Sequence, residues 1–287
     1  MKLVFIHGRS QGGKDPVALQ QTWEDSLDEG LANAGLSRPA GLEIAFPFYG
    51  DLLDDLIEQL EAPLVADVVE RGAAQDDSEA DFRGEFLAEI AAGSNLTEED
   101  IRENFDADFA ERGALNWKWV RAIIQTLDKS RRLGDLSLDQ FTRDVYVYLT
   151  NPAVRRRIDG VVSPHVGGER CVVVGHSLGS VVGYNVLLDQ TNPVVRYVTV
   201  GSPLAVKSVK RRLRSPLRMP PTTSSWYNAM DPDDIVALHP LEGAHFDITP
   251  PIVNHKDVVN TTDNQHGIVG YLPDPWVARA IHEALTA

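Results

Sequence analysis

A serine framed by glycines constrains the fold of this 287-residue chain more than any other feature. Ser177 is the centre of G-H-S-L-G at residues 175–179, a G-x-S-x-G pentapeptide. Residues 170–175 have the apolar character of a buried strand, and residues 180–188 have that of a helix. Side chains two positions before and after the serine would collide in so tight a turn, and glycine removes the collision. The pattern predicts a strand–turn–helix unit that presents the Ser177 hydroxyl at the edge of a sheet.

The rest of the chain alternates strand-like and helix-like segments. Asp15 and Pro16 supply an N-cap and a first helical residue, and residues 275–285 form a final helix. Val17, Leu19, Trp23, Leu27 and Leu31 would form the apolar face of the first helix. The strands are expected at 2–6, 42–46, 170–175, 194–201, 224–230 and, less clearly, near 252–259. The alternation predicts an α/β fold, a mostly parallel sheet flanked by helices with right-handed crossovers.

A long segment, residues 51–167, interrupts this alternation after the second expected strand. Its apolar residues have helical spacing, and it contains no convincing buried strand. Residues 144–148 alternate like a strand, but the spacing of Phe141, Val145 and Tyr148 favours a helix. A sequence resembling a helix capping box begins at Thr97. The segment is therefore predicted to be a helical insert.

The negative charge of the chain is concentrated in this insert. Between Asp51 and Glu111 there are 20 acidic and 3 basic residues, a charge of −17 in a chain whose net charge is −15. The remainder carries +2, so binding of nucleic acid is disfavoured, because phosphate contacts need a large positive excess. No apolar run approaches the roughly 18 residues of a membrane span, and no signal-peptide core follows Met1. We therefore expect a cytoplasmic protein.

The single cysteine, Cys171, limits the chemistry of the chain. It excludes an internal disulfide and any metal site built from several cysteines. Its place in a run of valines favours a buried strand residue over a reactive thiol. No cofactor and no bound metal are expected.

Residues 7–14, after the first expected strand, have two interpretations. From Gly8 the spacing is G-x-x-x-x-G-K, ending at Lys14, as in a phosphate-binding loop. Such a loop continues with Ser or Thr, which ligates Mg²⁺, but here Asp15 follows, and its carboxylate would repel a phosphate. We favour the second interpretation, a glycine-rich loop whose backbone curls round an oxyanion.

With these motifs the chain resembles the α/β-hydrolase superfamily, in particular its lipase, esterase and thioesterase-like members. The resemblance covers residues 1–50 and 168–287, which we expect to form the core domain. It does not cover residues 51–167, which we expect to form an acidic cap or lid. In related hydrolases, helices inserted among the strands often cover the site.

The resemblance also implies which residues carry the chemistry. Ser177 would be the nucleophile, and its neighbour Leu178 would give one backbone amide to the oxyanion hole. A second amide would come from the loop after the first strand, with Arg9 the first choice and Ser10 the second. In this family the catalytic triad runs in the order serine, acid, histidine.

Three carboxylates follow the strand expected at 224–230, namely Asp231, Asp233 and Asp234. The stretch D-I-V-A-L-H-P from Asp234 is similar to the D-I-V-P-x-L-P stretch of lipases, with Ala237 where proline is usual. The resemblance therefore favours Asp234 as the acid. Asp231 is the alternative acid, or else a turn residue before a proline.

His266 is the expected base among eight histidines. It lies in the polar stretch T-T-D-N-Q-H-G between the last expected strand and the final helix, where the family places its base. His245 and His255 lie upstream and are less suitably placed. The expected partner is a small-molecule ester or lipid.

Several alternatives stay open at this point. The same triad serves serine peptidases and thioesterases, and an inactive hydrolase fold would act as a binding module. The basic residues in 206–218 would bind anionic head groups at a membrane surface, pair with the acidic insert, or form a solvated face. The insert carries apolar side chains that would line an acyl pocket or pack it onto the core, namely Phe105, Phe109, Leu115, Trp117 and Trp119. The oligomeric state is left open.

Overall fold

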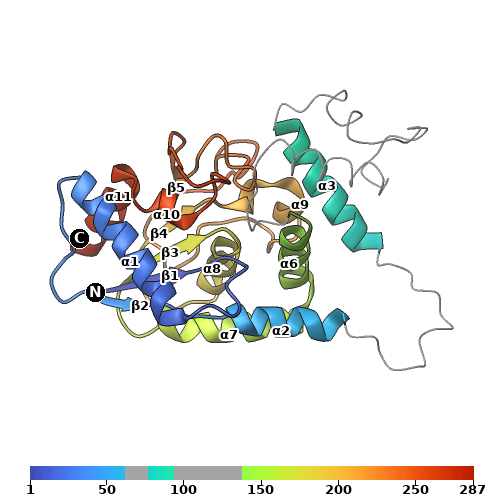
Figure 1. The fold of residues 1–287 in the computed structure, drawn as a ribbon, viewed down its shortest axis with the longest axis horizontal. Coiled ribbons are helices and arrows are strands. Elements are labelled where there is room, and N and C mark those ends of the chain that lie inside the picture. Colours follow the sequence, from blue (N-terminus) through green and yellow to red (C-terminus); the bar gives the residue numbers. More distant parts are fainter. Residues whose placement is uncertain (62–76, 94–137) are drawn as a thin grey trace.

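The computed structural model describes residues 1–61, 77–93 and 138–287 (Figure 1). Its centre is a single parallel sheet of six strands in the order β2-β1-β3-β4-β5-β6. The strands are β1 (Lys2–Ile6), β2 (Glu43–Ala45), β3 (Cys171–His176), β4 (Val194–Val200), β5 (Trp226–Ala229) and β6 (Val253–His255). The predicted α/β class and the predicted position of each of these strands are confirmed.

Helices cover both faces of this sheet (Figure 1). On one face lie α1 (Pro16–Asn33), α10 (Ile268–Tyr271) and α11 (Pro275–Thr286). The other face is covered by α2 (Gly50–Glu61), α6 (Leu138–Thr150), α7 (Pro152–Val166) and α8 (Leu178–Leu188). Beside α6 lie α3 (Asp77–Gly93) and α9 (Lys207–Lys210), and the 3-10 helix η1 (Pro203–Ala205) precedes α9.

The pleat of β1 explains why its residues 3–6 are all apolar. Leu3 and Phe5 pack into the core under α1 and α11, whereas Val4 and Ile6 pack into the core under α7 and α8. Successive side chains of a strand point to opposite faces, and both faces of a parallel sheet are covered by helices. Each residue of β1 is therefore buried.

The start of α1 follows the sequence, but its apolar face is narrower than predicted. Asp15 is the N-cap and its carboxylate accepts from the amide of Val17. Trp23 and the leucines further along the helix are buried as expected, but Val17 is 76% exposed, so its prediction is wrong. At 3.6 residues per turn Val17 lies about 110° from the mean direction of the buried residues, outside the contact with the sheet.

The described helices of the insert belong to the same core as the sheet. The helical spacing of the apolar residues at 52–60 and 141–148 is confirmed by α2 and α6. Ile57 and Val145 share one buried cluster with Val4 of β1. These contacts join the two sides of the predicted domain boundaries at residues 51 and 167. The division into two domains stays a prediction. The expected capping box and the five apolar candidates between Phe105 and Trp119 lie outside the described residues.

The strand order creates a switch point beside β1. The chain passes from β1 to β2 on one side and then to β3 on the other side. At such a point the loops leaving the carboxyl ends of adjacent strands turn to opposite faces, and ligands bind in the crevice between them. The loop after β1 begins at His7 and the turn after β3 is at Ser177, so the topology brings the two sequence motifs together.

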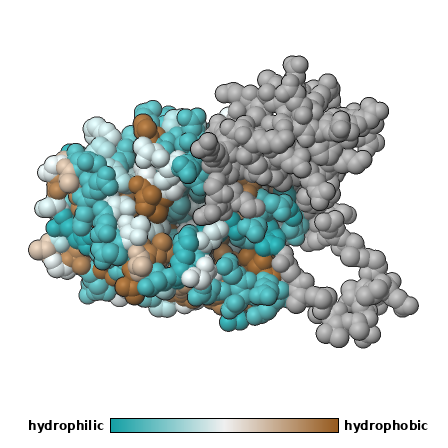
Figure 2. Space-filling view, in the orientation of Figure 1, coloured by the Kyte–Doolittle hydropathy of each residue, from teal (hydrophilic) through white to brown (hydrophobic). Residues whose placement is uncertain are grey.

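The outer surface has no large apolar area on the face seen in Figure 2, where hydrophobic residues form small separate groups among hydrophilic ones. Scattered surface apolar residues are normal for a globular protein. Within the part of the chain that the structure describes, no helix has the length and apolarity to span a bilayer.

Candidate functional site

The turn at Ser177 is as tight as the sequence predicts. Ser177 is buried at the start of α8 and has φ 55° and ψ −129°, a conformation rare for residues with a side chain. A Cβ added at Gly175 would lie 2.8 Å from Cα of Ser180, and one added at Gly179 would lie 2.1 Å from the carbonyl oxygen of Ile6. Only glycine fits at these two positions, so the close packing of β1, β3 and α8 fixes the backbone of Ser177.

His266 is held by Asp234 at the carboxyl edge of the sheet. Its Nδ1 lies 2.8 Å from Oδ2 of Asp234, and both side chains are buried. Because a carboxylate oxygen only accepts, Nδ1 carries the proton. The other ring nitrogen, Nε2, is buried and makes no hydrogen bond within the described residues. A neutral imidazole in this tautomer offers the lone pair of Nε2 to an incoming proton.

The carboxylate of Asp234 is surrounded by hydrogen-bond donors. Oδ1 accepts from the amides of Val236 at 2.8 Å and Ala237 at 3.3 Å. Oδ2 also accepts from the Tyr271 hydroxyl at 2.6 Å. Burial alone would raise the pKa of Asp234, but the facing imidazole and these hydrogen bonds outweigh it, and the pKa lies below its ordinary value. Asp234 is therefore ionised at neutral pH.

The alternative acid, Asp231, has a different environment. Its Oδ1 accepts from the amide of Asp233 and its Oδ2 from the amide of Asn260, each at 2.6 Å. The first bond closes a turn after β5, and the second ties this loop to the loop after β6. The structure therefore brings Asp234, and not Asp231, into contact with His266.

Three residues that the sequence analysis missed hold His266, two of them at its backbone and one beside its ring. Nε2 of His176 donates to the carbonyl oxygen of His266 at 2.7 Å, and Oδ1 of Asn264 accepts from its amide at 3.0 Å. A Cβ added at Gly201, which has φ 58°, would lie 3.1 Å from Nδ1 of the imidazole. The position of Gly201 at the carboxyl end of β4 was a signal that could have found it.

Burial governs the protonation of His176. It lowers the pKa of His176 to about 3, so the ring is neutral at physiological pH and keeps a proton on the nitrogen that faces His266. In the sequence His176 counted only as part of the pentapeptide. Its role in the structure is to position the loop that carries His266.

The loop after β1 touches Ser177 directly. A Cβ added at Gly8 would lie 2.9 Å from Cβ of Ser177, so a side chain there would displace the loop. Nε2 of His7 accepts from the amide of Tyr49 at 3.0 Å, and Nδ1 donates to the carbonyl oxygen of Gly8 at 2.7 Å. The Tyr49 hydroxyl donates to the carbonyl oxygen of His7. A buried ring thus fixes the start of the loop.

The predicted oxyanion donors lie on both sides of Ser177. Leu178 is the first residue of α8, and Arg9 and Ser10 follow Gly8 in the loop. Within the described part of the chain, the backbone amides of these three residues donate to no other group. Ser10 has φ 57°, which turns the backbone sharply after Arg9. The geometry leaves both Arg9 and Ser10 as candidates for the second donor.

The same loop does not form a phosphate cradle. The amide of Gly13 donates to the carboxylate of Asp51 at 2.7 Å, and Oδ2 of Asp54 lies 1.9 Å from the place of a Cβ at Gly12. Lys14 donates to the side chain of Gln11 at 3.2 Å. Two carboxylates beside the glycines would repel an anion, which weighs against the first interpretation of this stretch.

The side chain of Arg9 joins this loop to the insert. Its Nε lies 2.5 Å from Oδ2 of Asp144 on α6, 135 residues further along the chain. The side chains are 8% and 2% exposed, so the ion pair is buried. Gln140, one turn earlier on α6, accepts from Nη2 of Arg9 at 3.2 Å. Nothing in the sequence pairs residues so far apart.

A pocket opens above Ser177 and His266, and we call it the α1–α10 pocket. Its volume is about 260 Å³. Two helices supply its walls, with Leu19 and Trp23 from α1 and Ile268 and Val269 from α10. The lining is completed by residues 8–11, Lys14, Thr22, His176, Asn264 and Gly267.

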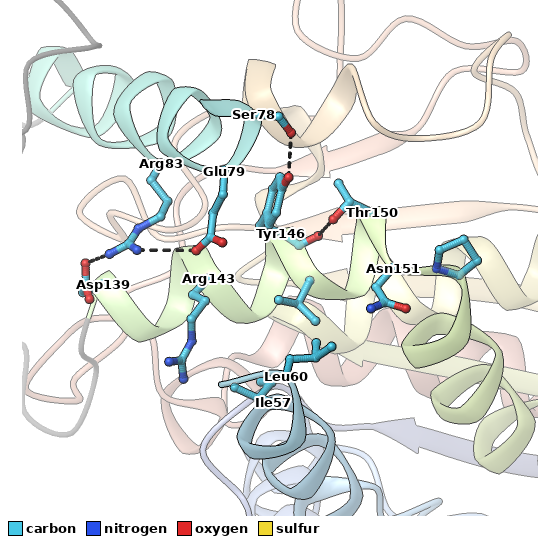
Figure 3. A pocket seen from close by; sticks show the side chains of 12 residues that line it. Ile57, Leu60, Ser78, Glu79, Arg83, Asp139, Arg143, Tyr146, Thr150 and Asn151 are labelled. Carbon is cyan, nitrogen blue, oxygen red and sulfur yellow. Dashed lines mark hydrogen bonds and ion pairs between the residues drawn. The ribbon is translucent and has the colours of Figure 1, made fainter. Parts of the chain in front are cut away.

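A larger cavity, of about 860 Å³, lies elsewhere, between α2, α3 and α6 (Figure 3). It shares no lining residue with the α1–α10 pocket. Its polar groups bond to one another, since Tyr146 contacts Ser78 and Arg83 contacts Glu79 (Figure 3). This cavity is the larger of the two, but the candidate catalytic residues Ser177 and His266 line the smaller one.

The basic segment at 206–218 pairs with acidic groups of the same chain. Arg211 contacts Glu85 of α3 at 2.7 Å, and Arg214 makes two bonds of 2.5 Å with Asp189. Of the three interpretations, these contacts favour pairing, in part with the insert. Arg211 and Arg214 are thus paired within the chain, which leaves less positive charge for anionic head groups.

Comparison with protein-family models, with curated proteins and with solved structures finds no match for this chain. Within the described ranges, no three histidine, cysteine or acidic side chains are grouped as a metal site. The function is therefore inferred from the chemistry of the residues at the carboxyl edge of the sheet.

Proposed function

We propose that this protein is a serine hydrolase that cleaves a carboxylic ester through an acyl-enzyme on Ser177. One observation carries the proposal. The imidazole of His266 is bound at one nitrogen to the buried carboxylate of Asp234, while its other nitrogen, at the pocket that Ser177 shares, is buried with no partner among the described residues. An unpaired buried acceptor costs about 1–3 kcal/mol, which is expected where the group serves a reaction.

The acylation step follows from these positions. Nε2 of His266 takes the proton of the Ser177 hydroxyl as the oxygen forms a bond to the ester carbonyl carbon. The carbonyl π electrons move to its oxygen, which becomes an oxyanion. Asp234 stabilises the imidazolium that forms and keeps its proton on Nδ1. The bond to the alcohol then breaks, and the proton on Nε2 passes to the leaving oxygen.

The oxyanion needs donors that are already in place. Within the described residues, the amides of Leu178, Arg9 and Ser10 donate to no other group. Loss of one oxyanion donor costs about a hundred- to a thousandfold in rate. Water then attacks the acyl-enzyme, gives its proton to Nε2, and the acid leaves as that proton returns to Ser177. No step requires a cofactor.

The finer assignment of the fold is part of the same proposal. The switch point, the turn at Ser177 and the order serine, acid, histidine support an α/β-hydrolase fold. For residues 51–167 we propose a cap over the carboxyl edge of the sheet. Its support comes from Asp144, which pairs with the loop after β1, and from Glu89 of α3, which accepts from His239 after β5 at 2.8 Å.

Labelling by a small fluorophosphonate tests the proposal. The probe should modify the purified protein at Ser177, the label should be lost in Ser177→Ala, and it should persist in the matched control Ser163→Ala on α7. Absence of labelling in the folded wild-type protein would favour an inactive binding module. A panel of p-nitrophenyl esters, thioesters and peptides then identifies the bond that is cleaved, because the triad does not choose the leaving group.

A further inference from the structure

The α1–α10 pocket limits the size of the group that reaches Ser177. Pockets for drug-sized ligands have volumes of about 300–1,000 Å³, whereas an apolar cavity of about 150 Å³ holds benzene. The volume here, about 260 Å³, lies between these values. A long lipid chain would exceed it, and a short or compact group would fill it.

The walls of this pocket are apolar and rigid. Trp23 is buried, with its ring centroid 5.2 Å from that of Phe5 and 5.5 Å from that of Phe46. Such packing holds the indole in one position. Leu19 and Ile268 are apolar, and of the two cations in the lining Arg9 is paired with Asp144 and Lys14 donates to Gln11. The pocket therefore favours an uncharged apolar group.

The neighbouring cavity does not extend this pocket for an acyl chain. It has about 370 Å³ and shares Arg9 and Ser10 with the α1–α10 pocket. Its other lining residues include Asp54, Glu58 and Asp144. A hydrocarbon chain placed there would remove charged groups from water without pairing them, which is unfavourable.

We propose that the substrate carries a short, uncharged acyl group, of about two to six carbons, which binds in the α1–α10 pocket between Trp23 and Val269. This inference rests on the proposed esterase function and adds the class of substrate to it. A longer chain leaves the pocket and gains no further buried contact with the described residues.

The dependence of kcat/KM on chain length tests the inference, with p-nitrophenyl esters from acetate to decanoate, each below its micellar concentration. Each methylene that enters the pocket should raise kcat/KM up to about fourfold. The rate constant should reach its maximum at or before the hexanoate and rise no further up to the decanoate. A value that still rises at the decanoate overturns the inference.

Two variants should move this maximum in opposite directions. Leu19→Ala widens the pocket and should move it to a longer chain, while Val269→Phe narrows the pocket and should move it to a shorter one. Val253→Phe is the control, because this valine of β6 lies outside the pocket and is 60% exposed, compared with 43% for Val269. If all three variants keep the wild-type profile, the pocket does not bind the acyl group.

Covalent labelling separates this inference from the proposed function, because it needs no turnover. A butyl fluorophosphonate should label Ser177 at least as fast as a dodecyl one, because the additional methylenes of the dodecyl probe lie outside the pocket. Faster labelling by the dodecyl probe would overturn the inference and keep the hydrolase. Failure of both probes on the folded protein would remove the proposed function, and the inference with it.

Discussion

Three residues with side chains adopt a left-handed backbone conformation in the described part of the chain, and all three border the site. They are Ser10, Ser177 and Gln265, with φ between 50° and 57°. Such a conformation costs about 1–3 kcal/mol at each residue and persists only where the surroundings enforce it. Ser10 and Ser177 line the pocket, and Gln265 directly precedes His266. Strain is thus concentrated where the chemistry is proposed.

Replacing the two buried aspartates after β5 one at a time distinguishes their roles. Asp234→Asn should lower kcat by about 10⁴-fold, because an amide at this place stabilises the wrong tautomer of His266. Asp231→Asn should keep kcat within a few-fold and lower the free energy of unfolding by about 1–3 kcal/mol, since it weakens a bond within the loop after β5 and one to the loop after β6. Ester kinetics and urea unfolding of both variants measure this. A greater loss of kcat in Asp231→Asn would assign the acid to Asp231.

His7 should make stability depend on pH. Burial lowers the pKa of its ring to about 4 in the folded protein, from about 6.5 in the unfolded chain. Between these values the unfolded chain binds more protons, so the free energy of unfolding should fall as pH falls, by up to about 1.4 kcal/mol per pH unit. Urea unfolding at pH 7, 6 and 5 measures the slope.

The variant His7→Gln is the control for this slope. It removes the titrating ring and should reduce the slope by nearly the contribution of one histidine. His176, whose pKa is lowered to about 3, contributes in the same direction and remains in the variant. An unchanged slope in His7→Gln would show that the ring titrates alike in the folded and unfolded states.

At the scale of elements, the site is assembled from α6 and from loops that leave four parallel strands, with His266 in the loop after β6. The loop after β1 carries the predicted oxyanion donors, the turn after β3 carries Ser177, and Asp234 follows β5. These loops lie at one edge of the sheet because parallel strands have their carboxyl ends together. The ion pair of Arg9 with Asp144 adds α6 to this assembly.

Two isosteric variants should separate a buried ion pair from an exposed one. Asp144→Asn leaves the buried guanidinium of Arg9 without a counter-charge and should lower the free energy of unfolding by about 3–5 kcal/mol. Glu85→Gln breaks the pair with Arg211, whose side chains are 38% and 61% exposed, and should cost less than about 1 kcal/mol. Urea unfolding of both measures the difference, and equal losses would mean that Arg9 is not desolvated as its burial indicates.

At the scale of the whole molecule, the described helices of the insert are part of the core. α7 packs on α8 and β1, and α6 packs on α7. Ile158 and Val162 of α7 lie in the same buried cluster as Val4 and Val173 of the sheet. Removal of these helices would expose that face of the sheet to water, at about 25 cal/mol for each Å² of apolar surface.

Excision of the insert tests this packing. A chain in which Gly50 is joined to Gly168 by a short flexible linker should lose its cooperative thermal transition and bind a hydrophobic dye, because one face of β1 and β3 is uncovered. Near-ultraviolet circular dichroism and dye fluorescence measure it against the full chain. A shortened chain with a single sharp transition would show that residues 1–50 and 168–287 fold alone, as the sequence predicts.

Much of the fold was predictable because it is encoded locally. Runs of apolar β-branched residues marked β1, β3 and β4, and Asp15 with Pro16 marked the start of α1. The proximity of Asp234 to His266 agrees with the order expected from the resemblance. Val17 was misplaced because helical spacing does not say where a helix meets the sheet.

The sequence by itself determined the strand–turn–helix at Ser177, since only glycine at 175 and 179 tolerates the contacts of that turn. Only the tertiary structure decided which distant groups meet there. His176 finds the carbonyl oxygen of His266 and Arg9 finds Asp144 because strand order and helix packing bring them together. Such contacts are fixed by the summed burial of many apolar side chains over the whole sheet, a quantity that no short stretch of sequence contains.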